Sequence, residues 1–132
     1  MSIRNTMSML LAGSLLAACS STESVITEFA QQRWDAMISG NLPQAYEYYT
    51  DAFKATTPLD VFKHKANGVG LWSKAQVKQV QCEASGKRCQ VAVDVTVSMK
   101  MRGLSKPVDT SDVVNETWVK DGWFSDWRYV KQ

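Results

Sequence analysis

The chain has 132 residues, of which 15 are lysine or arginine and 13 are aspartate or glutamate, so its net charge at pH 7 is only +2. That length suits one domain with a real core and is too short for two ordinary domains. The basic side chains are scattered from Arg33 to Arg128 and expected to be mostly solvated, whereas nucleic-acid binding needs a clustered basic excess. We therefore expect a single domain that does not bind nucleic acid.

Residues 1–18 have the layout of a secretory signal. Arg4 supplies a positive charge, residues 7–16 form an apolar run, and small residues follow it. The run is shorter than the roughly 18–20 apolar residues that span a bilayer, so we expect a removable signal rather than a transmembrane helix. The sequence Leu-Ala-Ala-Cys at residues 16–19 resembles the lipobox of bacterial lipoproteins.

This resemblance implies cleavage before Cys19, a diacylglyceryl thioether on its sulfur and attachment to an envelope membrane. Several acyl chains make such attachment stable, because each buried CH₂ contributes about 0.8 kcal/mol. Gram-negative lipoproteins retained in the inner membrane typically have aspartate at the next position, where this chain has Ser20. We therefore expect an outer-membrane anchor facing the periplasm, with residues 1–18 removed, residues 19–23 as a short tether and residues 24–132 as the domain. The alternative is a soluble exported protein with an accidental cysteine.

Helical spacing dominates the first part of this domain. Apolar residues recur at three- and four-residue intervals from Ile26 to Met37 and a glycine follows, which predicts a helix over about residues 24–39. Start signals at residues 41–44 and 57–60 predict two further helices. The aromatic residues of the second one, which we expect to pack in the core rather than line a cavity, are Tyr46, Tyr48 and Tyr49.

After Gly70 apolar and polar residues alternate, which is the pattern of half-buried strands. The predicted strands lie near residues 73–83, 88–101, 112–120 and 123–131, and residues 102–110 form a long connection. The parity of the apolar residues switches between Val77 and Val80, which predicts a β-bulge between them. Helices followed by a bent antiparallel sheet of about four strands define an α+β fold.

Cys82 and Cys89 are predicted to form a disulfide. A two-residue turn at Ser85-Gly86 sets them opposite each other on paired strands, on the face of the valine stripe that begins at Val91. With Cys19 as the anchor, this remaining pair would reach an oxidising compartment. A redox-active pair is the alternative, but catalytic dithiols usually have Cys-x-x-Cys spacing at the start of a helix.

The order of these elements resembles the cone-shaped fold of nuclear transport factor 2 and ketosteroid isomerase over nearly all of residues 24–131. Residues 33–46, which begin Arg-Trp-Asp-Ala-Met and end Gln-Ala-Tyr, are similar to that family's paired opening helices. Residues 117–124, Thr-Trp-Val-Lys-Asp-Gly-Trp-Phe, are similar to its closing hairpin. None of these stretches is a catalytic motif. The fold hosts enzymes, ligand binders and partner-binding modules, so the resemblance implies an architecture and no activity.

Enzymes of that fold need an acid or a base inside the cone, and two residues are candidates. Asp35 follows Trp34 on the first predicted helix, and His64, the sole histidine, lies two positions from Phe62 on the third. Such an aspartate more often pairs with a nearby base, and a histidine off the apolar face is usually a surface residue. No cofactor or metal is expected, because one histidine, two bonded cysteines and dispersed carboxylates do not meet the ligand count of zinc.

The tryptophans around the last predicted hairpin are Trp118, Trp123 and Trp127. A two-residue turn at Asp121-Gly122 would pair Trp127 with Glu116. All three tryptophans then share one face, which is either an aromatic and charged surface typical of protein interfaces or the lining of the cone. This face is the best indication of a protein partner in the sequence.

Two classes of function remain. A tethered, non-catalytic binding or assembly module needs only the anchor and the aromatic hairpin, with the membrane and an envelope protein as its partners. An isomerase- or dehydratase-like enzyme, or a binder of hydrophobic ligands in the cone, needs a pocket that the sequence does not reveal. We therefore expect the binding module. A buried aspartate or histidine beside a tyrosine in a roomy cavity would favour the enzyme instead.

Overall fold

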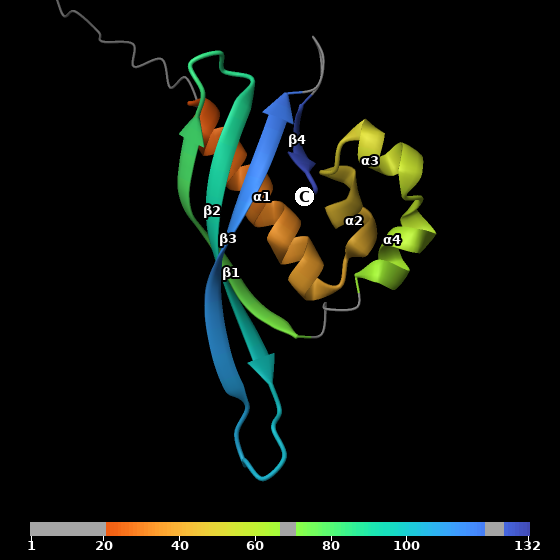
Figure 1. Ribbon diagram of the computed structural model, residues 1–132, viewed down its shortest axis with the longest axis vertical. Coiled ribbons are helices and arrows are strands. Elements are labelled where there is room, and N and C mark those ends of the chain that lie inside the picture. The colour runs from red at the N-terminus through yellow and green to blue at the C-terminus, as the bar shows by residue number, and fades with distance from the viewer. Residues whose placement is uncertain (1–20, 67–70, 121–125) are drawn as a thin grey trace, which may run out of the picture.

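The computed structural model describes residues 21–66, 71–120 and 126–132. The helices are α1 (Thr22–Ser39), α2 (Leu42–Glu47), α3 (Asp51–Thr56) and α4 (Leu59–Lys65). The strands are β1 (Trp72–Cys82), β2 (Arg88–Met99), β3 (Val108–Lys120) and β4 (Trp127–Val130). They form one antiparallel sheet in the order β1-β2-β3-β4, with α1 lying across it and the three short helices beside α1 (Figure 1). The predicted α+β class is confirmed.

Capping residues set the bounds of the helices. The side chain of Ser21 accepts a hydrogen bond from the backbone N–H three residues on (3.2 Å), so α1 begins slightly earlier than predicted. Gly40 ends α1 in the left-handed conformation, with φ of 79°. Asn41 caps α2 in the same way as Ser21 caps α1. Thr50 caps α3, a helix that the apolar spacing did not predict.

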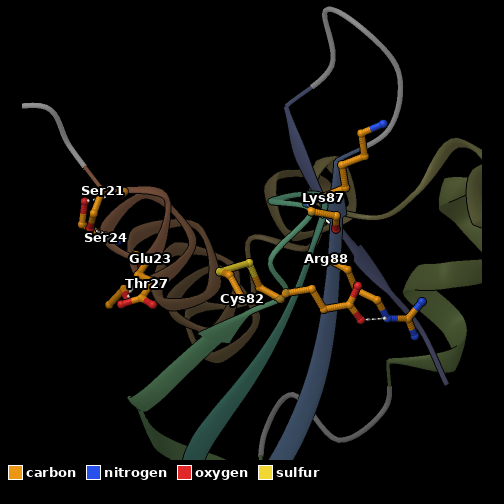
Figure 2. Close-up of a disulfide and its surroundings, with 10 residues drawn as sticks. Ser21, Glu23, Ser24, Thr27, Cys82, Lys87 and Arg88 are labelled. Atoms are coloured by element: carbon orange, nitrogen blue, oxygen red, sulfur yellow. Dashed lines mark hydrogen bonds and ion pairs between the residues drawn. A yellow bond between two sulfur atoms is a disulfide. The ribbon is translucent and has the colours of Figure 1, made fainter.

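The register of the β1–β2 hairpin agrees with the prediction. Cys82 faces Cys89 and is bonded to it (Figure 2), and a β-bulge lies between Val77 and Gln79. The side chain of Gln31 on α1 accepts a hydrogen bond from the N–H of Val77 (3.1 Å) and donates to the carbonyl oxygen two residues earlier (2.9 Å). This amide therefore covers the free edge of β1 beside the bulge, where unpaired backbone groups would otherwise be exposed.

The core lies between the helices and the concave face of the sheet. Its first cluster joins α1 to the valine stripe of β2 and includes Ile26, Ala30, Trp34, Val91, Val93 and Val95. Its second cluster joins the helices and consists of Ala36, Met37, Ala45, Tyr46, Tyr49 and Phe62. The stripe continues along β2 to Met99, but that side chain is exposed, because β1 begins at Trp72, opposite Val97, and does not extend to Met99. The first part of the stripe is thus core and the last part is surface.

The second half of the sheet differs from the prediction in its register. Lys120 pairs with Trp127 and Trp118 pairs with Tyr129, so the pairing expected from a two-residue turn is wrong. The predicted Asp121-Gly122 turn and Trp123 lie outside the described residues. Trp118 and Trp127 are 0% and 6% exposed, so these two belong to the core and form no outward interface. The register is shifted by four residues, and because that number is even, Trp127 stays on the same face of the sheet as Trp118.

The long connection is also shorter than predicted. β3 begins at Val108, opposite Met99, so part of the predicted loop is strand. The backbone ladder between β2 and β3 continues beyond the end of β1, and the two strands form a ribbon that extends past the rest of the domain (Figure 1).

Candidate functional site

A buried ion pair joins α1 to β3. Arg33 and Glu116 are 3% and 1% exposed, and Nη2 of the arginine donates a hydrogen bond to Oε1 of the glutamate. The expectation that the scattered basic residues are mostly solvated therefore fails for Arg33. Burying two charges is expensive unless each is paired and hydrogen-bonded, so this pair must be well coordinated.

Three donors engage the carboxylate of Glu116. Besides Arg33, the indole N–H of Trp34 donates to Oε1 (2.7 Å), and the indole N–H of Trp118 donates to Oε2 (2.9 Å). Three donors from two elements therefore hold one carboxylate, which locks α1 onto the inner face of the sheet. A carboxylate engaged in this way is poorly placed to accept a proton from a substrate.

Aromatic rings surround the guanidinium of Arg33. Its Cζ lies 4.1 Å from the ring centroid of Tyr129, 4.9 Å from that of Trp34 and 5.6 Å from that of Tyr49. Nη1 donates to the hydroxyl of Tyr49 at 3.3 Å. The Nε–H is buried and has no hydrogen-bond partner among the described residues. The arginine is thus fixed in place, and Nε is the one guanidinium nitrogen without a partner among the described residues.

The sequence did not lead us to predict this pair, although the patterns of α1 and β3 each contained a signal for it. Arg33 follows Ile26 and Ala30 and precedes Met37 at helical intervals, so it lies on the apolar stripe of α1. Glu116 shares the parity of Trp118, so it lies on the inner face of β3. A charged residue of opposite sign at a core position in each of two elements predicts a buried pair.

A cavity of about 260 Å³ opens beside Arg33 at the mouth of the cone. Its walls are mainly aromatic and apolar, with Trp34, Met37, Tyr49, Phe62, Trp72 and Tyr129 among them. Lys65 of α4 and Lys131, just after β4, also line it. None of the described residues that line this cavity is acidic. Glu116 in particular does not line it.

A second cavity, of about 430 Å³, adjoins the first. The two share Trp34, Trp72 and Val114, and the second continues over the side chains of β2 and β3 as far as Met99. Asp112 lines this second cavity. Sites for small ligands are typically apolar hollows of about 300–1,000 Å³ with a few polar groups, and this volume and lining fit that description.

Two tyrosine hydroxyls remain neutral donors in the cavity at physiological pH. Burial raises the pKa of Tyr129 to about 12 and raises the pKa of Tyr49 as well, while the nearby positive charge of Arg33 partly opposes both shifts. The expectation that the tyrosines pack in the core is therefore correct for Tyr49, but its ring also lines the cavity.

The candidate catalytic residues from the sequence do not line this cavity. Asp35 is exposed and accepts a hydrogen bond from the side chain of Gln31 (2.9 Å), and His64 is exposed on α4. Within residues 21–66, 71–120 and 126–132 there is no group of three or more metal-ligating side chains, and no helix is long and apolar enough to cross a membrane. Cys19 lies outside the described residues.

The arrangement defines an α+β cone with an apolar mouth, and solved structures share this fold. No protein-family model and no curated protein matches the chain. A SEC-C motif containing protein from Rhodopseudomonas palustris is 12% identical, with a TM-score of 0.56, over 78% of this chain and 73% of its own. A SEC-C motif containing protein from Psychrobacter arcticus is 15% identical, with a TM-score of 0.54, over 78% of this chain and 56% of its own.

A candidate ketosteroid isomerase from Shewanella frigidimarina has the same architecture over most of both chains. It is 11% identical, with a TM-score of 0.52, over 83% of this chain and 91% of its own. Such low identities show the fold alone, because one fold supports many unrelated activities. The resemblance to the ketosteroid isomerase cone that the order of elements indicated is therefore correct for the architecture.

Proposed function

We propose that the protein is a non-catalytic binding module of the bacterial cell envelope, anchored through Cys19, whose cone cavity holds a small, mainly apolar ligand with an anionic group. The observation that carries the ligand proposal is the lining of the smaller cavity. Its walls are aromatic and apolar, and its charged residues are Arg33, Lys65 and Lys131.

The chemistry of the lining suggests a role for each part of the ligand. An apolar body would gain from burial against Trp34 and Trp72, whose rings meet edge to face at 5.5 Å. An anionic group would be attracted to Lys65 and Lys131. The charge of Arg33 is already balanced by Glu116, so this arginine would contribute its unused Nε–H rather than a net charge.

The main alternative is an isomerase-like enzyme, for which the neutral hydroxyls of Tyr49 and Tyr129 are the supporting observation. Such chemistry also needs a base within hydrogen-bond reach of the substrate. Glu116 is buried near Tyr49, but it does not line the cavity and three donors occupy it. A binding role therefore requires fewer assumptions than a catalytic one.

Titration of the tryptophan fluorescence tests the ligand proposal. Straight-chain carboxylates should bind about tenfold or more tightly than the alcohols of equal length, since hydrogen bonds to charged groups contribute roughly 1.5–3 kcal/mol. Lys65→Gln or Lys131→Gln should reduce that preference. Lys63→Gln is the matched control, because Lys63 is exposed on the same helix and does not line the cavity. Equal binding of acids and alcohols would contradict the proposal.

Acyl labelling in cells tests the anchor separately. Cys19→Ala should abolish the uptake of labelled palmitate and leave unprocessed precursor, because in the lipoprotein pathway the thioether precedes cleavage. Cys82→Ser, which removes a cysteine of the disulfide, should keep the label and serves as the control. An outer-membrane location is tested by separating the two envelope membranes. Palmitate uptake by the Cys19→Ala variant would rule out this anchor.

A further inference from the structure

The arm tip, which we define as residues 98–108, has an unusual surface. It connects β2 to β3 at the end of the ribbon that extends beyond the other elements (Figure 1). The large apolar side chains of this segment, with their exposed fractions, are Met99 (44%), Met101 (54%), Leu104 (57%) and Val108 (37%). Among the described residues, these four form the densest run of exposed apolar side chains along the chain.

Positive charges alternate with these apolar residues. Lys100, Arg102 and Lys106 lie in the arm tip, which contains no acidic residue, and the next acid along the chain is Asp109. None of the three basic side chains forms an ion pair or a side-chain hydrogen bond with a described residue. The tip therefore presents three free cations and four apolar side chains together.

The turn at the opposite end of the sheet provides a contrast within the same molecule. Residues 83–88 join β1 to β2 and contain no large apolar side chain. There Arg88 pairs with Glu83 at 3.8 Å, and a disulfide closes the hairpin (Figure 2). Of these two turns, only the arm tip combines exposed apolar side chains with basic side chains that have no ion-pair partner among the described residues.

We propose that the arm tip docks onto an anionic lipid surface, with Met101 and Leu104 entering the bilayer interface and the three cations contacting lipid phosphates. Interfacial binding elements combine apolar side chains with lysine and arginine in this way. A stable protein interface buries about 800 Å² on each partner and usually centres on aromatic or arginine anchors in a shaped pocket. A narrow ribbon tip with methionine and leucine side chains suits a fluid bilayer better, since a bilayer needs no complementary shape.

This docking would also orient the cavity. Met99 lies at the base of the arm tip and lines the larger cavity, so an arm on the bilayer brings that opening close to the lipid surface. The described N-terminal end of α1 lies at the other end of the sheet (Figure 1). If the proposed anchor at Cys19 is also engaged, the long axis of the domain lies along the membrane.

The test uses the full chain in vesicles, with an environment-sensitive dye on one added cysteine. Ser105→Cys places the dye in the arm tip without removing an apolar or charged side chain, and Ser85→Cys places it in the contrasting turn; both serines are exposed. With anionic vesicles we expect a blue shift and quenching by lipid-bound quenchers for the dye at position 105 but not at 85. Zwitterionic vesicles should give a smaller shift.

Two sets of variants separate the contributions of charge and apolar contact. Replacing Lys100, Arg102 and Lys106 by glutamine should lower the ratio of docked to free arm on the order of 100-fold, at about fivefold per charge. Met101→Gln with Leu104→Gln should also release the arm, whereas Val113→Gln, an exposed valine on β3 outside the arm tip, should not.

A dye at position 105 that stays in water would overturn the proposal. A lipid-free shift that grows with protein concentration would also overturn it, because it would indicate contact with a second copy.

The anchor and the arm can fail independently in this design. If the chain does not sediment with vesicles at all, the anchor is wrong, whereas sedimentation with an unshifted dye at position 105 rejects the arm alone. Neither outcome depends on whether the cavity binds carboxylates.

Discussion

The two ends of β2 carry the same sequence pattern and have different surroundings. Near Val91 and Val93 the alternating apolar residues pack under α1, next to a disulfide and the pair of Arg33 and Glu116. Near Met99 the same alternation continues in a ribbon that β1 does not reach. A period of two therefore tells which residues share a face, but only neighbouring elements decide whether that face becomes core or surface.

The difference has an energetic meaning. Apolar side chains under α1 contribute roughly 25 cal/mol per Å² that they remove from water, whereas exposed ones contribute little to folding. The arm tip is thus free to serve a surface role, while the part of β2 that packs under α1 must supply stability to the domain. Four predictions, from the largest expected effect to the smallest, test this division.

Breaking the buried pair should have the largest effect. Arg33→Met leaves Glu116 buried without its cation and should lower the free energy of unfolding by about 3–5 kcal/mol, measured by denaturant titration. Glu116→Gln should cost a similar amount, and the double variant should cost less than the sum. Arg88→Met, which breaks an exposed pair at the closed turn, should cost at most about 1 kcal/mol. Equal losses for the buried and exposed pairs would contradict this ranking.

Removing the disulfide should have the next largest effect. Cys82→Ser with Cys89→Ser should destabilise the domain by about 2.5 kcal/mol without abolishing folding, because a short closed loop loses little entropy and the valine face remains. Thermal unfolding of the oxidised and doubly substituted proteins measures the difference. Thiol counting on the purified protein should find this pair unreactive, and two free thiols after export would refute the bond.

High pH should lower the free energy of unfolding of the domain, because Tyr129 ionises. The folded phenol has a pKa of about 12, whereas the unfolded one ionises at its ordinary value of 10.0, so unfolding releases a proton between these pH values. The stabilisation is fully present below pH 10 and is lost as the pH rises through about 12. Tyr129→Phe should make stability less dependent on pH in this window, and an unchanged slope of stability against pH would count against the burial of this hydroxyl.

Substitutions in the arm tip should change stability least. Met101→Ser and Leu104→Ser should each stay within about 0.5 kcal/mol of the unchanged protein, because both side chains are exposed. Val93→Ala, on the covered part of the stripe, should cost more than about 1 kcal/mol in the same denaturant titration. An arm variant that unfolds as easily as Val93→Ala would show that the arm is part of the core.

The sequence by itself determined the features that depend on local chemistry. Helical spacing and caps predicted α1 and the start of α2, and a two-residue turn predicted the pairing of Cys82 with Cys89. The switch of parity after Val77 predicted the bulge. Each of these depends on residues within a few positions of one another, where turn geometry and side-chain direction are fixed by the backbone.

Only the tertiary structure decided the features that need partners far apart in the chain. In the sequence Arg33 is one of many scattered bases, and only the packing of α1 against β3 pairs it with Glu116. The register that sets Trp127 opposite Lys120 instead of Glu116 is likewise seen only in the folded sheet. The cavity is equally non-local, since its lining comes from α1, the segment between α2 and α3, α4, β1, β3, β4 and the segment after β4. A local pattern can place a charge on the inner face of an element, but its partner and the shape of a cavity are set by elements distant in the chain.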